Sequence, residues 1–132
     1  MGRILIVDDV ADTCEMMATF LRKNGHQVRT TPNGREALAA LSERMPDLAI
    51  LDLRMPEMDG ISFLEVIKSY LRWESLPVIL ISGYKDDPRL VRAAQLGVKK
   101  IFLKANFQLH ELLETVNQYA SPGAVPAAPS RM

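Results

Sequence analysis

The chain has 132 residues, with 16 Lys and Arg against 16 Asp and Glu, so its formal net charge is zero. This length suits one domain with a hydrophobic core and excludes a multidomain enzyme. The balanced charge excludes the general basic field with which many proteins hold nucleic acid by its phosphates. The single cysteine, Cys14, excludes an internal disulfide, and no apolar run reaches the roughly 20 residues of a membrane-spanning helix. We therefore expect a cytoplasmic protein.

The first third of the chain alternates apolar runs with segments of helical periodicity. Ile4–Val7 is a continuous apolar run that stops at an aspartate pair, as a strand buried on both faces would. Residues 12–24 have helical spacing, with Asp12 as the expected N-cap. A short strand over 26–31 follows, and the turn Pro32–Gly34 predicts the start of a second helix.

The middle of the chain repeats this pattern twice. Leu48–Leu53 is an apolar strand interrupted by an aspartate, and the loop 54–60 leads into a helix that contains Phe63. Pro77–Ile81 is the next apolar strand. The dipeptide Asp87-Pro88 then predicts a helix with aspartate as its N-cap and proline at its first position.

The remaining elements complete five strand–helix units by residue 120. The fourth helix should end near Gly97, and Lys100–Leu103 predicts the fifth strand. A leucine and valine stripe over 109–116 predicts the last helix. We expect residues 1–120 to form one domain and residues 121–132, which are rich in proline and alanine, to form a flexible tail.

Five alternating units predict an α/β fold with a doubly wound parallel sheet. Parallel strands need crossover helices, and right-handed crossovers place those helices on both faces of the sheet. We expect five strands in the flavodoxin-like order 2-1-3-4-5, in a three-layer sandwich. In such sheets ligands bind outside the carboxyl ends of the strands, at the switch point between strands one and three.

Polar residues follow the predicted strands at this same edge. Asp8 and Asp9 follow strand one, Asp52 follows strand three, Ser82 strand four and Lys104 strand five. Two carboxylates 4 Å apart repel by roughly 4 kcal/mol at an effective dielectric constant near 20. A hard divalent cation such as Mg²⁺, which binds carboxylate and phosphate oxygens, would relieve that repulsion. The pattern therefore predicts a magnesium site beside a lysine.

With these residues in place, the chain resembles the receiver domains of two-component response regulators, such as chemotaxis response regulators. The resemblance covers residues 3–119, and its motifs are Ile4–Asp9, Leu51–Gly60, Ser82-Gly83 and Lys104. Each motif alone is weak, and their order and positions at the strand ends make the combination specific. The resemblance implies a phosphoprotein that works in signal transduction within a phosphorelay.

The resemblance also implies a role for each matched residue. Asp52 would be the phosphoacceptor, and Mg²⁺ would be held by Asp8, Asp9, Asp52 and the main-chain carbonyl of Arg54. The partners implied are a histidine kinase or phosphotransfer protein and an unknown downstream protein, with no direct contact to nucleic acid or membrane. Such a module is not an enzyme and at most assists its own phosphotransfer and dephosphorylation.

The last part of the match departs from the family pattern. By the resemblance, Ser82 and Lys104 would bind the phosphoryl oxygens, but Ala105 follows the lysine where the family usually has a proline after a cis peptide. A cis bond without proline costs about 2.5–4 kcal/mol, so we expect trans. Ile101 stands where the family often has a tyrosine or phenylalanine whose ring turns inward when the switch residue moves. Because of these changes, the resemblance does not settle the shape of the loop after Lys104. It also does not settle how a change at Ser82 is transmitted to the rest of the domain.

Three functions remain open from the residues alone. The first is the phosphorylated switch, with output through the face of the fourth helix, fifth strand and fifth helix. The basic residues expected on that face are Arg89, Arg92, Lys99 and Lys100. The second is a receiver-like scaffold that binds without phosphorylation. The third is a metal-dependent phosphatase, although its usual second carboxylate would fall at Arg54.

Overall fold

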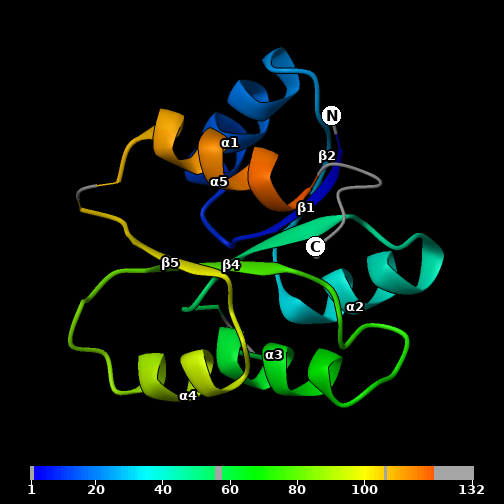
Figure 1. Ribbon diagram of the computed structural model, residues 1–132, viewed down its shortest axis with the longest axis vertical. Coiled ribbons are helices and arrows are strands. Elements are labelled where there is room, and N and C mark those ends of the chain that lie inside the picture. The colour runs from blue at the N-terminus through cyan, green and yellow to red at the C-terminus, as the bar shows by residue number, and fades with distance from the viewer. Residues whose placement is uncertain (1, 56–57, 106, 121–132) are drawn as a thin grey trace, which may run out of the picture.

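The structure, a computed structural model, describes residues 2–55, 58–105 and 107–120. Within those residues, five parallel strands form one sheet in the order β2-β1-β3-β4-β5, with five helices between and after them (Figure 1). The elements are β1 (Arg3–Val7), α1 (Ala11–Lys23), β2 (Gln27–Thr31), α2 (Gly34–Glu43), β3 (Leu48–Asp52), α3 (Gly60–Lys68), β4 (Val78–Ser82), α4 (Arg89–Gln95), β5 (Lys100–Leu103) and α5 (Leu109–Tyr119). The predicted doubly wound, flavodoxin-like fold and its strand order are confirmed.

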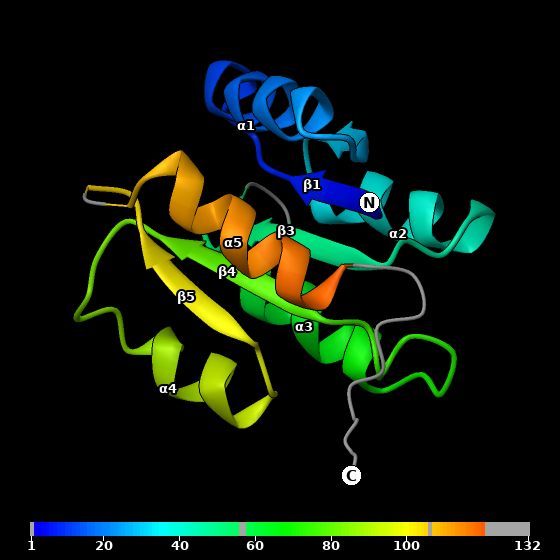
Figure 2. The same ribbon diagram turned by 45° about the horizontal axis from the view of Figure 1, so that its top comes forward.

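The helices lie on both faces of the sheet and give the molecule three layers. α1 and α5 cover one face, and α2, α3 and α4 cover the other (Figures 1 and 2). β3 and β4 are buried at all five of their positions because helices cover both of their faces. Strand alternation sends Ile4 and Ile6 to one hydrophobic cluster, and Leu5 and Val7 to the other.

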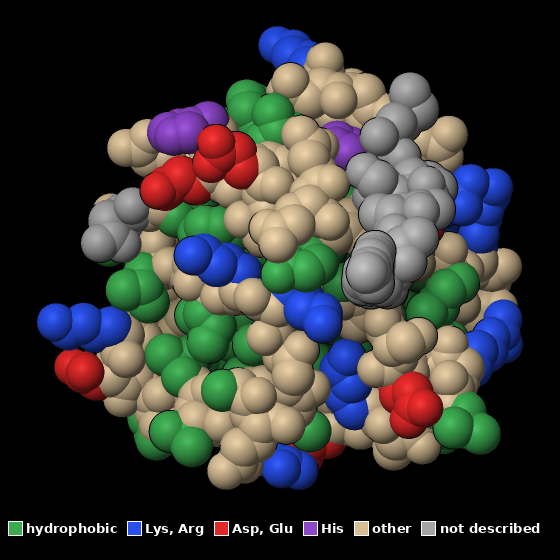
Figure 3. All heavy atoms as spheres, in the orientation of Figure 1, with side chains coloured by type: hydrophobic (Ala, Val, Ile, Leu, Met, Phe, Trp, Pro, Cys, Tyr) green, Lys and Arg blue, Asp and Glu red, His purple; other side chains and the backbone are tan. Residues whose placement is uncertain are grey.

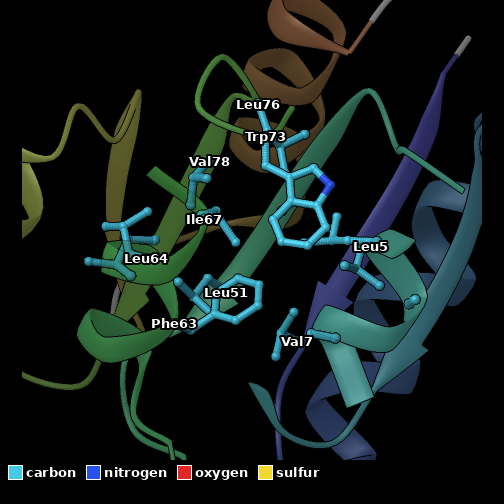
Figure 4. Packing of buried hydrophobic residues seen from close by; sticks show 14 of the residues in the cluster. Leu5, Val7, Leu51, Phe63, Leu64, Ile67, Trp73, Leu76 and Val78 are labelled. Carbon is cyan, nitrogen blue, oxygen red and sulfur yellow. The ribbon is translucent and has the colours of Figure 1, made fainter. Parts of the chain in front are cut away.

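The larger cluster lies between the sheet and α2 and α3. Figure 4 shows Phe63, Leu64 and Ile67 of α3 meeting side chains from β1, β3 and β4, among them Leu51 and Val78. All five side chains are fully buried. Burying an apolar side chain of this size contributes about 1.5–3 kcal/mol to folding, so this cluster holds the strands, and the residues that follow them, in place.

The connection from α3 to β4 closes the N-terminal edge of the sheet. Lys68 Nζ donates hydrogen bonds to the carbonyl oxygens of Glu74, at 3.0 Å, and Leu76, at 3.1 Å, and its burial lowers the pKa of Lys68. Trp73, in the middle of this connection, is buried in the same cluster as Leu5. The tryptophan therefore lies near the beginnings of the strands, at the edge opposite to their carboxyl ends.

The start of α1 differs from the prediction. The helix begins at Ala11, so Asp12 lies inside its first turn and is not the N-cap, and Val10 in the cap position makes no side-chain cap. The main-chain N–H of Val10 instead donates to Asp8 Oδ1 at 2.9 Å. The aspartate that ends the strand thus also satisfies an amide at the helix entrance, which spacing along the sequence did not indicate.

The start of α4 is shifted by one residue, its end lies near Gly97 as predicted, and one prediction falls outside the described residues. α4 begins at Arg89, one residue later than predicted, although the Asp87 carboxylate accepts the Arg89 N–H at 3.0 Å as a cap would. The helix ends at Gln95, and Gly97 follows with a φ of 84°. The tail predicted over 121–132 lies outside the described residues. None of the described helices is both long enough and apolar enough to cross a membrane.

Gly60 should be sensitive to substitution because α3 starts against the end of β3. A Cβ at Gly60 would lie 2.8 Å from Leu53 Cα and 2.9 Å from the Asp52 carbonyl oxygen, both of which are backbone atoms. We predict that Gly60→Ala lowers the free energy of unfolding by about 1–3 kcal/mol, measured by urea denaturation. Gly83→Ala is the matched control because a Cβ there meets nothing within 4 Å. Equal stability of the two variants would contradict the prediction.

Candidate functional site

Three carboxylates meet where β1 and β3 end. Asp52 is the last residue of β3, Asp8 and Asp9 directly follow β1, and β1 and β3 are neighbours in the sheet. Each of the three offers an oxygen, and these oxygens all lie within 4.8 Å of one another. Asp8 and Asp52 are buried, and Asp9 is exposed. The structure therefore brings together the acidic residues in which the sequence predicts a metal site.

Asp8 has a buried carboxylate oxygen without a hydrogen-bond partner among the described residues. Burial raises the pKa of Asp8 to about 6, the hydrogen bond from the Val10 N–H opposes this rise, and the negative charge of Asp52 adds to it. Asp8 Oδ2 is buried and has no hydrogen-bond donor among the described residues. A buried anionic oxygen without a donor is costly, and a cation beside it would supply the missing partner. Three hard oxygen donors with one such oxygen suit Mg²⁺.

Asp52 is held from two sides by the chain itself. Lys104 Nζ donates to Asp52 Oδ2 at 3.1 Å, and the Arg54 N–H donates to Asp52 Oδ1 at 3.1 Å. Lys104 follows β5, two strands away, so its long side chain spans the gap over β4. These bonds fix the orientation of the carboxylate and partly balance its charge.

A cavity of about 440 Å³ opens over these groups. It is lined by Asp9, Val10, Asp52, Arg54, Met55 and Lys104. The volume admits a hydrated cation together with a group of phosphate size, each water occupying about 30 Å³. The site thus combines a cation-binding end, an oriented carboxylate and a lysine in one open pocket.

Ser82 is placed differently from the other predicted site residues. It is the last residue of β4 and is fully buried. Its hydroxyl donates to the Tyr84 carbonyl oxygen at 2.9 Å and accepts the Tyr84 N–H at 3.2 Å. Both of these hydrogen bonds lie within the turn after β4, and neither joins Ser82 to the carboxylate cluster.

Arg89 connects two loops in a way that the sequence did not indicate. Its guanidinium donates to both carboxylate oxygens of Asp87, at 3.1 and 2.8 Å, and lies 3.7 Å from Asp59 Oδ2. Asp59 is the N-cap of α3 and accepts the Ser62 N–H. The hydrogen bonds with Asp87 raise the pKa of Arg89 and lower that of its partner. The loop after β4 is therefore tied to the start of α3.

The predicted basic face over α4, β5 and α5 is only partly free. Arg89 is engaged as above, and Arg92 donates to Glu65 at 2.9 Å in an exposed ion pair. Lys99 and Lys100 are exposed, and they lie over the rings of Tyr119 and Phe102, at 5.8 and 5.7 Å. Figure 3 shows a row of blue side chains crossing the middle of this view, with green apolar side chains between them.

The departures from the family pattern have local structural consequences. The Lys104–Ala105 peptide bond is trans, as predicted, and Asn106 lies outside the described residues. Ile101 is half-buried and packs against the cluster under α3 and α4, so it fills space as an aliphatic side chain. The neighbouring Phe102 faces the other cluster and packs against Phe107, with 5.5 Å between ring centres.

The buried charge of Asp8 should lower the stability of the metal-free protein at neutral pH. Its folded pKa lies above the unfolded value of 3.8, so the stabilisation from this group is present below about pH 4 and lost as pH rises through 6. We predict that the free energy of unfolding of Asp8→Asn rises by about 2 kcal/mol relative to that of the wild type as the pH goes from 4 to 7.5. Urea denaturation in EDTA measures this. Asp12→Asn, an exposed change on α1, should show no such gain.

The comparisons with known proteins agree with this geometry. The family model for the response regulator receiver domain matches residues 4–117. The chain is 38% identical over 117 residues to the chemotaxis protein CheY of Bacillus subtilis, covering 88% of this chain and 95% of that protein. It is 34% identical to the transcriptional regulatory protein GltR of Pseudomonas aeruginosa, of which it spans 46%.

A solved structure shows the same likeness in three dimensions. The signal receiver domain of a signal transduction histidine kinase from Syntrophus aciditrophicus superposes with a TM-score of 0.85 at 32% identity, covering 100% of this chain and 98% of that chain. The matched region includes all five strands and the acidic cluster between β1 and β3. The chain belongs to the family of response regulator receiver domains of two-component signal transduction.

Proposed function

We propose that Asp52 accepts a phosphoryl group and that residues 1–120 work as the phosphorylated switch of a phosphorelay. The observation that carries this proposal is the placement of Asp52. Its carboxylate is buried, oriented by Lys104 and the Arg54 N–H, and adjacent to two further carboxylates. A buried carboxylate with that much like charge beside it is costly in a purely structural role.

The residues present also suit the cation that receiver domains use. We assign the magnesium ligands to Asp8, Asp9, Asp52 and the main-chain carbonyl of Arg54, the first three of which form the oxygen cluster. The unpartnered Asp8 Oδ2 supports this assignment. When bound, Mg²⁺ supplies positive charge against the oxygens of a phosphoryl group.

The chain's own groups account for the transfer step. An oxygen of Asp52 forms a bond to phosphorus while the bond from phosphorus to the donor's leaving group breaks, and the bonding electrons leave with that group. Lys104, already 3.1 Å from the carboxylate, pairs with the added phosphoryl oxygens. The product is an aspartyl phosphate with more negative charge and more acceptor oxygens than the carboxylate.

Ser82 gives the switch a physical basis. Its hydroxyl has one proton, so donating to a phosphoryl oxygen on Asp52 would end the 2.9 Å bond to the Tyr84 carbonyl oxygen. The turn after β4 would then lose one of its internal restraints. Because Arg89 ties that loop to the start of α3, the change is transmitted to α4 and the surface beside it.

The proposed partners follow from this chemistry. Receiver domains interact with histidine kinases and downstream effectors, and here we assign the phosphoryl donor to a histidine kinase or a phosphotransfer protein. The output partner would dock on the face of α4, β5 and α5, where Lys99 and Lys100 are exposed. We assign no turnover beyond the domain's own phosphorylation and dephosphorylation.

Phosphorylation can be tested with a small-molecule donor. Incubation with Mg²⁺ and acetyl phosphate should add one phosphoryl group to the intact mass of the wild type. Asp52→Asn should lose this gain because the amide lacks the nucleophilic oxygen, whereas Asp12→Asn should keep it. No mass gain in wild type, with the protein folded, would favour the scaffold that binds without phosphorylation.

Metal binding can be measured separately from phosphorylation. We predict that Asp8→Asn weakens Mg²⁺ binding by more than about tenfold in calorimetric titration, because it removes a charged oxygen ligand from the cluster. Asp47→Asn, at the opposite edge of the sheet, is the control and should bind as wild type does. Unchanged affinity in Asp8→Asn would place the cation elsewhere.

A further inference from the structure

A second cavity, of about 260 Å³, opens at the N-terminal edge of the sheet, opposite the acidic cluster. It lies between the first residues of β1 and β2 and the C-terminal end of α2. Three arginines from separate elements line it, namely Arg3 of β1, Arg29 of β2 and Arg44 directly after α2. Among the described residues that line this cavity, none is acidic.

The positive charge of this arginine-lined cavity is only partly balanced by the protein. Arg29 donates to Glu43 Oε1 at 2.8 Å, in an ion pair whose side chains are 52% and 64% exposed. The nearby Asp47 carboxylate accepts the main-chain N–H of Arg3 at 2.8 Å. Arg44 makes no ion pair within the part of the chain that the structure describes. The three arginines thus have two carboxylates beside them, those of Glu43 and Asp47, so an excess of positive charge remains at the cavity.

One donor in the cavity wall lacks an acceptor altogether. Arg3 Nε is buried and has no hydrogen-bond partner among the described residues. Leaving such a donor unsatisfied costs about 1–3 kcal/mol, and more when the group is charged. The Arg3 side chain lines the open cavity, so an acceptor that enters the cavity would satisfy this N–H once the side chain turns toward it.

The rest of the wall and the size of the cavity restrict the ligand. Leu5, Ala40 and Pro46 supply apolar surface next to the arginines. The volume equals that of roughly nine waters at about 30 Å³ each, which is too small for a folded partner and right for a small molecule. Guanidinium groups match the paired oxygens of a phosphate, and a dianion can engage more than one of them.

We propose that this cavity binds a small phosphate monoester that carries an apolar group, with the phosphate on the arginines and the apolar group on the floor. The proposal goes beyond the switch described above and does not depend on it, because Asp52 lies at the other edge of the sheet. The ligand would contact β1, whose far end leads directly into Asp8 and Asp9.

Phenyl phosphate is the test ligand, because it joins a phosphate to an apolar ring. In calorimetric titrations of the full chain in EDTA, we expect one phenyl phosphate per chain, binding at least about tenfold tighter than inorganic phosphate. Phenol should not bind. Arg44→Ala and Arg3→Met should each weaken binding by about tenfold or more, since each removes a charge-assisted hydrogen bond.

Controls separate this cavity from the acidic site. Arg92→Ala, an exposed arginine on α4, should leave binding unchanged, and so should Asp52→Asn. Amide shifts in NMR spectra should gather at residues 3–5, 27–29 and 44. Trp73 fluorescence is a second readout, because its ring shares a cluster with Leu5 and its nitrogen faces β1 (Figure 4). Unchanged binding in Arg44→Ala, shifts centred on Asp52, or no saturable binding would each overturn the proposal.

Discussion

Repulsion among three carboxylates at the end of a buried sheet is the interaction on which the rest of this structure depends. Asp8 and Asp52 lie on neighbouring strands and are buried, so neither can lower its energy through water. The chain compensates only in part, through Lys104 and main-chain amides. The negative charge that remains unbalanced would be stabilised by an added positive charge. Under the proposed function, Mg²⁺ and a phosphoryl group would supply that charge, and the instability of the site would be the basis of its chemistry.

The loops around the site contain the bonds that the proposed switch would rearrange. Ser82 and Arg89 are both held by bonds to neighbouring loop groups, so the loop after β4 has one well-defined arrangement in this structure. With Asp52 phosphorylated as proposed, the added phosphoryl oxygens would compete for the hydroxyl of Ser82. A two-state response needs such a competition between nearly equal partners. Ile101 is aliphatic and packs in the cluster, so it has no ring that could turn inward. Any transmission of a change at Ser82 to β5 therefore differs from one that depends on an aromatic ring.

The parallel sheet also separates charge along its strands, which the overall balance of the chain conceals. Lys and Arg equal Asp and Glu in number, yet the carboxyl ends of β1 and β3 carry the acidic cluster, and Arg3 at the start of β1 and Arg29 in β2 line the cavity at the other edge. β1 thus has an apolar interior between polar ends. Because β1 runs between the two edges, it connects the arginine-lined cavity to the residues next to Asp52 through one rigid element.

The sequence by itself determined the alternation of elements, the strand order and the acidic cluster, because apolar runs that end in carboxylates carry a local signal and parallel strands place those ends at one edge. It misplaced the cap of α1, since Asp12 and Asp8 compete for the same role and only packing decides between them. Only the tertiary structure paired His26 with Gly2 and Asn117, across 24 and 91 residues. It likewise decided the bonds of Arg89 and gathered three arginines around one cavity. Contacts between residues far apart in the chain produce no periodic pattern in the sequence, because they depend on how the layers of the folded protein pack.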